Sequence, residues 1–351
     1  MRSRPKEGLP MQAIVCDRPG TLSIQEVAKP EPGPGMALIR VVATGVCGSD
    51  VRGYLGTHPD IVDYPVILGH EFAGVVDAVG DGVSHVAPGD RVAVEPLFVC
   101  GVCRACREGT YHLCARLELN GHQHPGSFAE WTVAPARFCY PVPGAMDFEI
   151  AALAEPAAVA VHAANRARPK LGDRAVVLGM GPIGLLCLQA LRLSGCRVMG
   201  VDVVPAKLEL AREMGAELAV DASATDAIEA VTDWTDGVGA DVVLESAGVR
   251  ETLAETVFMV RKGGTVVLLG FTGEDTDPIC LTRLMIKEAN FLGSVIYSQR
   301  DVPDAIELLA SGDLVGRPLI TDRCDLAGLV DMVPAAQDKS GGMLKPMCLL
   351  S

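Results

Sequence analysis

Short apolar runs separated by turn residues dominate the first 140 residues of the chain. The runs ALIRVVATGV (37–46), EFAGVVDAVG (71–80) and RVAVEPL (91–97) are rich in β-branched residues. Flanking segments such as PEPGPG and VAPGD combine proline, which fixes φ, with glycine, which tolerates positive φ. This pattern predicts a β-rich domain over the first part of the chain.

From about residue 174 onward, strand-like and helix-like segments alternate. In order they are RAVVLGM, PIGLLCLQALRLSG, RVMGVD and PAKLELAREMG, and DVVLES and TVVLLG continue the series. Alternation at this spacing predicts an α/β domain, a doubly wound parallel sheet with helices on both faces.

The last part of the chain gives weaker signals. FLGSVIYS (291–298) is expected to be a strand that ends the α/β sheet, DVPDAIELLAS (301–311) a helix and PLITD (318–322) a strand. At the other end, residues 1–10 (MRSRPKEGLP) are expected to form a disordered extension.

Composition narrows the class of protein. A chain of 351 residues is expected to form two domains, and 49% apolar residues are typical of a globular protein. With a net charge of −14 and no basic cluster, neither nucleic acid nor a membrane is an expected partner. We find no secretory leader and no apolar run of about 18 residues, so we expect a cytoplasmic protein with reduced thiols.

GMGPIG places Gly179, Gly181 and Gly184 in a G-x-G-x-x-G arrangement between a strand and a helix, with Pro182 at the expected first turn. Such glycines let backbone N–H groups approach a pyrophosphate at the helix N-terminus. The next strand ends in Asp202, whose carboxylate would accept a ribose 2′-hydroxyl and repel a 2′-phosphate. The motif therefore predicts a dinucleotide site that favours NAD over NADP.

Four cysteines lie close together in the stretch CGVCRACREGTYHLC. Cys100, Cys103, Cys106 and Cys114 have the spacing C-x2-C-x2-C-x7-C, which suits one loop around a single structural zinc ion. An iron–sulfur cluster is the alternative, but its fourth cysteine usually comes sooner and is followed by proline, whereas Ala115 follows here.

A second group of possible metal ligands is dispersed along the chain. It comprises Cys47 in GVCGSD, His70 and Glu71 in LGHEFAG, and Glu155 in LAEPAAV. None of these pieces indicates a metal site by itself.

Together, however, the motifs resemble those of the zinc-dependent medium-chain dehydrogenases, close to the sorbitol and L-threonine dehydrogenase branch. The resemblance covers residues 11–351, and its motifs occur in the family order: GVCGSD, LGHE, PGDRV, the four-cysteine loop, AEP, GMGPIG and GVD. It implies a β-rich GroES-like catalytic domain over 11–160, a Rossmann NAD-binding domain over 161–297, and a segment, 298–351, that completes the catalytic domain.

The resemblance also implies two zinc ions per chain, a structural one in the four-cysteine loop and a catalytic one. Cys47, His70 and a glutamate would hold the catalytic zinc. The glutamate is Glu155 or Glu71, which can exchange as ligands, and Asp50 would orient His70.

Further site residues follow from the same resemblance. Ser49 would carry the alcohol proton outward, although Arg52 stands where relatives often have a histidine. Tyr54 and Tyr297 match tyrosines of the substrate cleft, whereas Ile296 replaces an arginine that binds polyols. Coenzyme contacts are also expected from Pro182, Ile183, Lys207 and Gly270, and His122 and His124 are polar candidates for the substrate pocket.

The predicted function is oxidation of a secondary alcohol or polyol to the ketone with NAD, by a homotetramer or homodimer acting on a small-molecule alcohol. L-Threonine 3-dehydrogenase-like oxidation is the alternative. A zinc-free reductase of the same superfamily and a non-catalytic NAD-binding scaffold are more distant hypotheses, and metal content separates them, since a reductase would bind no zinc.

Overall fold

The computed structural model describes residues 10–273, 276, 278–338 and 342–350. The chain folds into two compact units: unit 1 comprises Met1–Glu155 and Leu319–Ser351, and unit 2 comprises Pro156–Pro318. Residues 1–9 of the expected extension lie outside the described residues, but Pro10 already belongs to a strand, where it pairs with Ala28.

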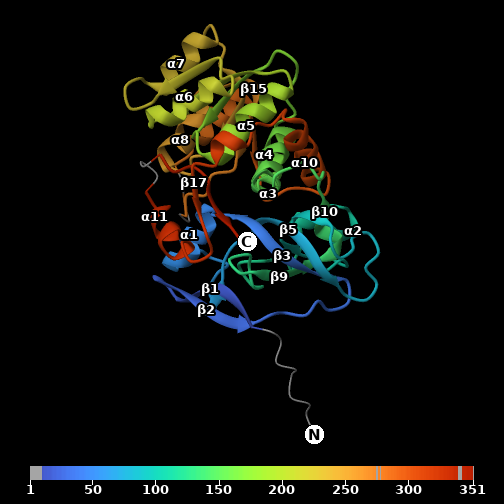
Figure 1. Ribbon diagram of the computed structural model, residues 1–351. Coiled ribbons are helices and arrows are strands. Elements are labelled where there is room, and N and C mark those ends of the chain that lie inside the picture. Colours follow the sequence, from blue (N-terminus) through green and yellow to red (C-terminus); the bar gives the residue numbers. More distant parts are fainter. Residues whose placement is uncertain (1–9, 274–275, 277, 339–341, 351) are drawn as a thin grey trace. The chain divides into compact units, whose positions relative to one another are not determined.

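Unit 1 is built from strands that form two main sheets, with short helices around them (Figure 1). The larger sheet has the order β10-β6-β5-β3-β18-β17, with β9 also paired to β3, and the smaller has the order β2-β1-β4. The strands are β1 (Pro10–Arg18), β2 (Thr21–Ala28), β3 (Met36–Gly45), β4 (Val66–Ile67), β5 (Glu71–Val79), β6 (Arg91–Val94), β9 (Trp131–Pro135), β10 (Cys139–Pro141), β17 (Asp322–Cys324) and β18 (Pro346–Leu349). The helices are α1 (Gly48–Leu55), α2 (Arg104–Arg107), α3 (Phe148–Ala152) and α11 (Leu329–Ala335), and β7 (Leu97–Phe98) pairs with β8 (Glu118–Leu119).

The end of the chain is an integral part of unit 1. Strand β18 runs antiparallel to β3, with Cys348 opposite Thr44, and also pairs with β17. Leu329 and Val333 of α11 belong to the same buried cluster as Val51 of α1. Residues more than 270 positions apart therefore share one core, which brings the C-terminal segment next to the motifs around residues 47–71.

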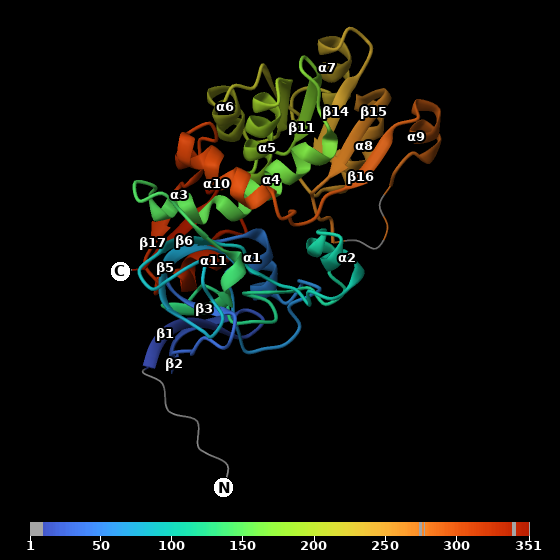
Figure 2. The same ribbon diagram turned by 90° about the vertical axis from the view of Figure 1, so that its right-hand side faces the viewer.

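Unit 2 contains one parallel sheet with the order β13-β12-β11-β14-β15-β16, and Figures 1 and 2 show helices on both of its faces. Its strands are β11 (Arg174–Leu178), β12 (Arg197–Asp202), β13 (Leu218–Asp221), β14 (Ala240–Glu245), β15 (Val260–Leu268) and β16 (Asn290–Gly293). Its helices are α4 (Ala154–Ala167, which starts at the unit boundary), α5 (Pro182–Leu193), α6 (Pro205–Glu213), α7 (Ala227–Trp234), α8 (Arg250–Met259), α9 (Leu281–Lys287) and α10 (Asp301–Ser311). The central strand β11 is buried beyond its first residue, as expected when helices cover both faces. The predicted α/β fold with a separate β-rich domain is confirmed.

The unit boundaries differ from the expected positions after residues 160 and 297. Helix α10 belongs to unit 2, because its first residue, Asp301, bonds to α4: His162 Nδ1 lies 2.7 Å from Oδ2 and Asn165 Nδ2 donates to Oδ1 at 2.9 Å. The chain therefore returns to unit 1 only at Leu319.

Two predicted strands are also corrected. The strand expected over 291–298 ends at Gly293, and Ile296 adopts a left-handed conformation (φ 57°) that a strand cannot contain. The strand expected over 318–322 is instead a 3₁₀ turn, Arg317–Leu319, followed by β17 from Asp322. Pro318 has no N–H to offer a sheet, which favours the turn.

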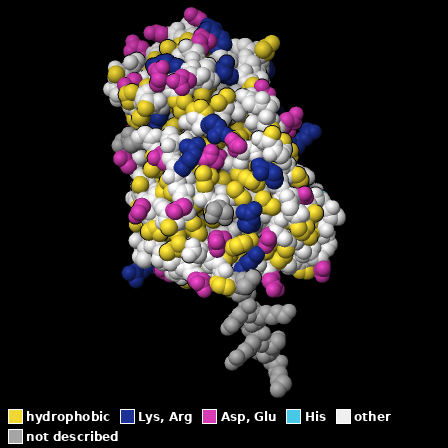
Figure 3. Space-filling model, viewed as in Figure 1, with side chains coloured by type: hydrophobic (Ala, Val, Ile, Leu, Met, Phe, Trp, Pro, Cys, Tyr) yellow, Lys and Arg dark blue, Asp and Glu magenta, His cyan; other side chains and the backbone are white. Residues whose placement is uncertain are grey.

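Charged side chains of both signs are visible on one face of the molecule (Figure 3). On the face drawn in Figure 3, basic and acidic side chains are interspersed without an extended basic area. Among the described residues, no helix combines the length and apolar character needed to cross a membrane.

Asp301 should contribute to stability in a pH-dependent way. Burial alone would raise its pKa, but hydrogen bonds from His162, Ser298 and Asn165 outweigh burial and lower the pKa to about 2. Because the folded-state pKa is depressed, this stabilisation is present above pH 4 and is lost as the pH falls through about 2. We expect Asp301→Ala to lower the free energy of unfolding at pH 7 by about 2–3 kcal/mol.

Denaturant unfolding followed by circular dichroism measures this effect, and Asp304→Ala, an exposed carboxylate on the same helix, is the control. Equal losses of stability in the two variants would contradict the assigned role of Asp301.

Candidate active site and metal centres

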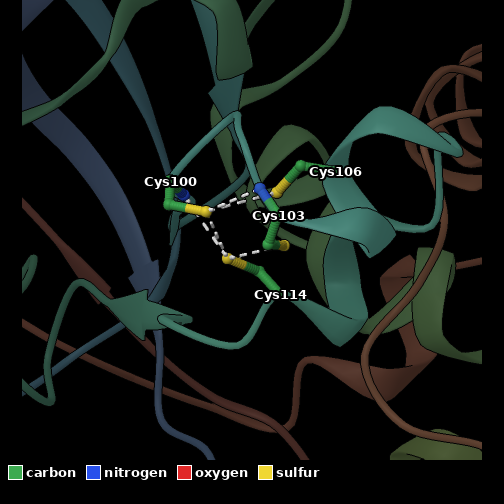
Figure 4. A group of neighbouring side chains, drawn as sticks. All are labelled: Cys100, Cys103, Cys106 and Cys114. Atoms are coloured by element: carbon green, nitrogen blue, oxygen red, sulfur yellow. Dashed lines mark hydrogen bonds between the residues drawn. The ribbon is translucent and has the colours of Figure 1, made fainter.

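The four cysteines of the loop converge on one point (Figure 4). The Sγ atoms of Cys100 and Cys106 lie 4.0 Å apart, those of Cys103 and Cys114 3.9 Å apart, and those of Cys114 and Cys100 3.5 Å apart. A tetrahedral zinc with Zn–S bonds of 2.3 Å requires sulfur–sulfur distances of about 3.8 Å. The geometry therefore fits a single ion, whereas a cubane iron–sulfur cluster would hold the sulfurs farther apart.

Backbone N–H groups in this loop favour the thiolate form of Cys100. Those of Val102 and Cys103 point at Cys100 Sγ and, as the main cause, lower the Cys100 pKa to about 6. By contrast, burial and the neighbouring thiols raise the pKa of Cys106 to about 12. All four sulfurs can ionise together only if a cation offsets their charges, and a divalent ion does so.

The second group brings together Cys47, His70 and Glu71, whose ligand atoms all lie within 4.8 Å of one another. Cys47 is the N-cap of α1, and the other two residues lie at the start of β5. His70 and Glu71 are buried, with 5% and 1% of their surface exposed. Sulfur, imidazole and carboxylate are the donor types that bind zinc in catalytic sites, so this set also fits the ion.

Asp50 holds the two halves of this group in place. Its fully buried carboxylate accepts hydrogen bonds from the backbone N–H of Cys47 (2.8 Å) and of Gly69 (2.9 Å). Its Oδ1 also lies 3.4 Å from His70 Nδ1. Asp50 thus faces one ring nitrogen of His70 and leaves Nε2 for a metal ion.

The other expected residues of this site are less closely grouped. Ser49 Oγ lies 3.3 Å from His70 Nε2, on the side that a metal would occupy. Glu155 begins α4, is half-buried and does not join the three ligand atoms, although its charge acts on Lys345. Tyr54 packs against the core beside α1, and Tyr297 is a fully buried residue of unit 2.

Lys345 is a residue of the site that sequence reasoning missed. Its Nζ donates to both oxygens of Glu71, at 2.7 and 2.6 Å, and lies 3.3 Å from the carbonyl oxygen of Val46. Only 4% of the Lys345 side chain is exposed. A Cβ atom on Gly45 would lie 2.4 Å from Glu71 Oε2, so glycine is needed there to make room. A lysine within the apolar run MLKPMCLL was the available signal.

The electrostatic field of the site favours a cation. Burial alone would lower the pKa of Lys345, but Glu71 and Cys47 outweigh burial and the pKa is raised. In the same way, burial opposes a proton on His70, yet Asp50 raises the His70 pKa well above its usual value. Negative charge is therefore in excess around these ligands, which a bound metal ion would offset.

The two histidines of one loop, His122 and His124, have different surroundings. His124 Nε2 lies 2.8 Å from Glu118 Oε2, and its ring stacks on Phe98 at 3.7 Å, away from the ligand group. His122, in contrast, contacts the ring of His70 edge-on, with 5.6 Å between centroids. Burial, followed by the charges of His70 and His58, lowers the pKa of His122 to about 3.

In unit 2, the glycine motif forms a tight strand-to-helix turn. Gly179 has φ 89°, and a Cβ on Gly184 would lie 1.8 Å from the carbonyl oxygen of Gly179, so neither position accepts a larger residue. Gly181 is the N-cap of α5 and Pro182 its first residue. The free N–H groups of this helix start are the ones expected to bind a pyrophosphate.

Asp202 ends β12 next to this turn. Its Oδ2 accepts from Met180 N at 2.7 Å, and its Oδ1 accepts from the N–H groups of Val203 and Val204 at 2.8 and 2.9 Å. A carboxylate has about four lone-pair sites, so one remains for a ribose hydroxyl. The three bonds hold it in one orientation.

The remaining expected coenzyme residues lie in the same unit. Ile183 is half-buried in the first turn of α5, and Lys207 lies on the first turn of α6. Gly270 follows β15, where a Cβ atom would lie 2.3 Å from Glu245 Oε2.

Comparison with known proteins identifies the protein family of this chain. The profile described as an alcohol dehydrogenase GroES-like domain matches residues 33–144, and that of the zinc-binding dehydrogenases matches residues 182–311. A sorbitol dehydrogenase of Bacillus subtilis is 34% identical over 343 residues, 96% of each chain. A D-xylulose reductase of Saccharomyces cerevisiae is 35% identical, covering 91% of this chain and 92% of its own.

Solved structures agree with this result. The crystal structure of a zinc-binding dehydrogenase from Sinorhizobium meliloti, bound to NADP, matches with a TM-score of 0.92 and 34% identity, covering 97% of this chain and 99% of that one. The chain therefore belongs to the zinc-dependent medium-chain dehydrogenase family, in its sorbitol dehydrogenase branch. It is a zinc-dependent oxidoreductase of alcohols or polyols that uses a nicotinamide dinucleotide.

The four-cysteine loop generates a prediction about metal content. Cys103→Ser should lower the zinc content from about two ions to about one per chain and lower Tm by at least about 5 °C, because the ion holds the loop folded. Metal analysis and thermal unfolding measure the two effects. Cys280→Ser, at an exposed cysteine of unit 2, is the matched control. Unchanged zinc content in Cys103→Ser would refute the structural role.

The buried ion pair generates a second prediction. Lys345→Met leaves the Glu71 carboxylate buried without its cation, and we expect the metal-free protein to lose about 3–5 kcal/mol of unfolding free energy. The double variant Lys345→Met/Glu71→Gln, which removes both charges, should recover part of this loss. Urea unfolding in the presence of a chelator measures both. A double variant as unstable as the single one would contradict the pairing.

Proposed function

We propose that the protein oxidises a secondary carbinol of a polyol or diol to the ketone, with NAD as the hydride acceptor. The observation that carries this proposal is the grouping of Cys47, His70 and Glu71, a donor set for a catalytic rather than a closed structural zinc. In the reaction, the carbinol carbon gives a hydride to the nicotinamide and its hydroxyl gives up a proton. The products are the ketone, NADH and a proton.

Each residue of the site has a separate role in this reaction. When bound, zinc would act as a Lewis acid that strongly lowers the pKa of a coordinated hydroxyl group. Cys47 and His70 would hold the ion, and Asp50 orients His70. Ser49 carries the hydroxyl proton outward, which its distance of 3.3 Å from His70 Nε2 supports.

The glutamates share one role in this proposal. Glu71 would be the third ligand of a bound zinc ion, since its oxygens belong to the ligand group. Glu155 would be the alternative carboxylate ligand. Lys345 donates to both oxygens of Glu71 and so holds this carboxylate in place.

Asp202 supports NAD as the coenzyme. Its carboxylate is held by three backbone N–H groups, with one lone-pair site left for a ribose 2′-hydroxyl. A 2′-phosphate at that place would meet a fixed negative charge. Ile183, Lys207 and Gly270 are proposed to contact the same coenzyme.

The proposed substrate class is supported by the relatives and by one substitution, Ile296. Relatives named sorbitol dehydrogenase and D-xylulose reductase favour hydroxylated substrates. Ile296 cannot donate a hydrogen bond where the branch uses arginine, which favours a shorter or less hydroxylated alcohol than sorbitol. Tyr54 and Tyr297 are each proposed to contact the substrate.

The proposal also includes an oligomeric state and a cellular compartment. We propose a homotetramer or homodimer, for which the edge strand β16, exposed at the end of its sheet, is the expected pairing surface. A reducing compartment such as the cytoplasm suits the chain, because all twelve cysteines are free of disulfides.

The test is an oxidation screen with NAD and NADP over polyols, diols, secondary alcohols and threonine, repeated with Cys47→Ala. We expect diols or polyols with NAD to be the best pair, and Cys47→Ala to lower kcat by more than about 10³-fold. The NADH dissociation constant, from fluorescence titration, should stay within about twofold, since Cys47 belongs to unit 1. Loss of NADH binding in step with activity would contradict a metal-centred role.

A further inference from the structure

His122 lies beside the metal-ligand group, and the proposed reaction gives it no role. Its ring contacts His70 and, at 4.7 Å between centroids, His58. Neither ring nitrogen has a hydrogen-bond partner among the described residues. Both nitrogens of an imidazole form hydrogen bonds, and buried polar atoms are normally paired because leaving them unpaired is costly. The ring therefore lacks the partner that a bound molecule can supply.

Backbone contacts hold His122 in this position. Gly126 N donates to the carbonyl oxygen of Ile67 at 2.8 Å, and Ser127 N donates to that of Gly69 at 2.9 Å. A Cβ atom on Gly121 would lie 2.7 Å from the oxygen of Gly69, so the loop packs directly on the residue before His70. The imidazole is thus placed by the same segment that presents the metal ligand.

His58 adds a second oriented ring. The backbone N–H of Asp60 donates to His58 Nδ1 at 3.1 Å, so in the neutral tautomer the proton of His58 is on Nε2. The side chain of Gln123, next to His122, donates to the carbonyl oxygen of Asp60 at 2.8 Å and connects the two loops. The two imidazoles form one wall beside His70.

We propose that His122 binds the second hydroxyl of a vicinal diol, the one on the carbon next to the carbon that is oxidised. A hydroxyl both donates and accepts, so it can pair with an imidazole nitrogen that donates or with one that accepts, whereas a carboxylate offers acceptors only. His122 therefore selects vicinal diols and polyols over alcohols with a single hydroxyl. This inference rests on the proposed function and specifies its substrate class.

The experiment compares 2,3-butanediol with 2-butanol, which differ by one hydroxyl, in the wild type and in His122→Phe. The variant keeps a flat ring but loses both hydrogen-bonding atoms. We expect kcat/KM for the diol to fall by about 10- to 100-fold, and that for 2-butanol to stay within about twofold. His122→Gln, which restores one donor and one acceptor, should recover part of the preference for the diol.

His124→Phe is the matched control, because it changes the same residue type in the same loop at a site away from His70, and we expect it to leave the ratio unchanged. Zinc content and Tm establish that each variant is folded. Equal losses on both alcohols in His122→Phe, or no loss on either, would overturn the inference while leaving the proposed function intact. A wild-type enzyme that oxidises neither alcohol nor any polyol would overturn both.

Discussion

The buried ion pair between Lys345 and Glu71 is the interaction on which the architecture of unit 1 depends. A carboxylate with 1% exposure can remain ionised only beside a cation, and here the cation comes from the last strand of the chain. The pair therefore makes the metal site conditional on the return of residues 319–350 to the first unit. The site is complete only when the C-terminal segment is in place.

Other contacts in the site also join segments that are separate in the chain. Asp50 uses one carboxylate to join the start of α1 to the residue before His70, through backbone N–H groups that would otherwise be unpaired. The loop that carries His122 is bonded to the segment that carries His70. Short, rigid backbone connections thus place side chains from three loops around a single point, and a zinc site requires such placement because its ligand distances tolerate little error.

Much of this could be predicted from the sequence, for identifiable reasons. The four cysteines lie within one short loop, and the glycine turn follows from local steric rules, so neither needs distant parts of the chain. The alternation of strands and helices predicted the class of fold. Boundaries were less accurate. The strand expected over 291–298 ends at Gly293, before the left-handed Ile296, and α10 belongs to unit 2 through Asp301, whose partners lie more than 130 positions away.

The sequence by itself determined the local chemistry: a thiolate-rich loop, a turn for a pyrophosphate, and residue types that suit a catalytic zinc. Only the tertiary structure decided which of these residues meet. It joins Glu71, rather than Glu155, to Cys47 and His70, gives Glu71 a cation from residue 345, and distinguishes His122 from His124. The physical reason is that burial and pairing depend on segments far apart in the chain, and no local pattern records which distant segment will cover a given side chain.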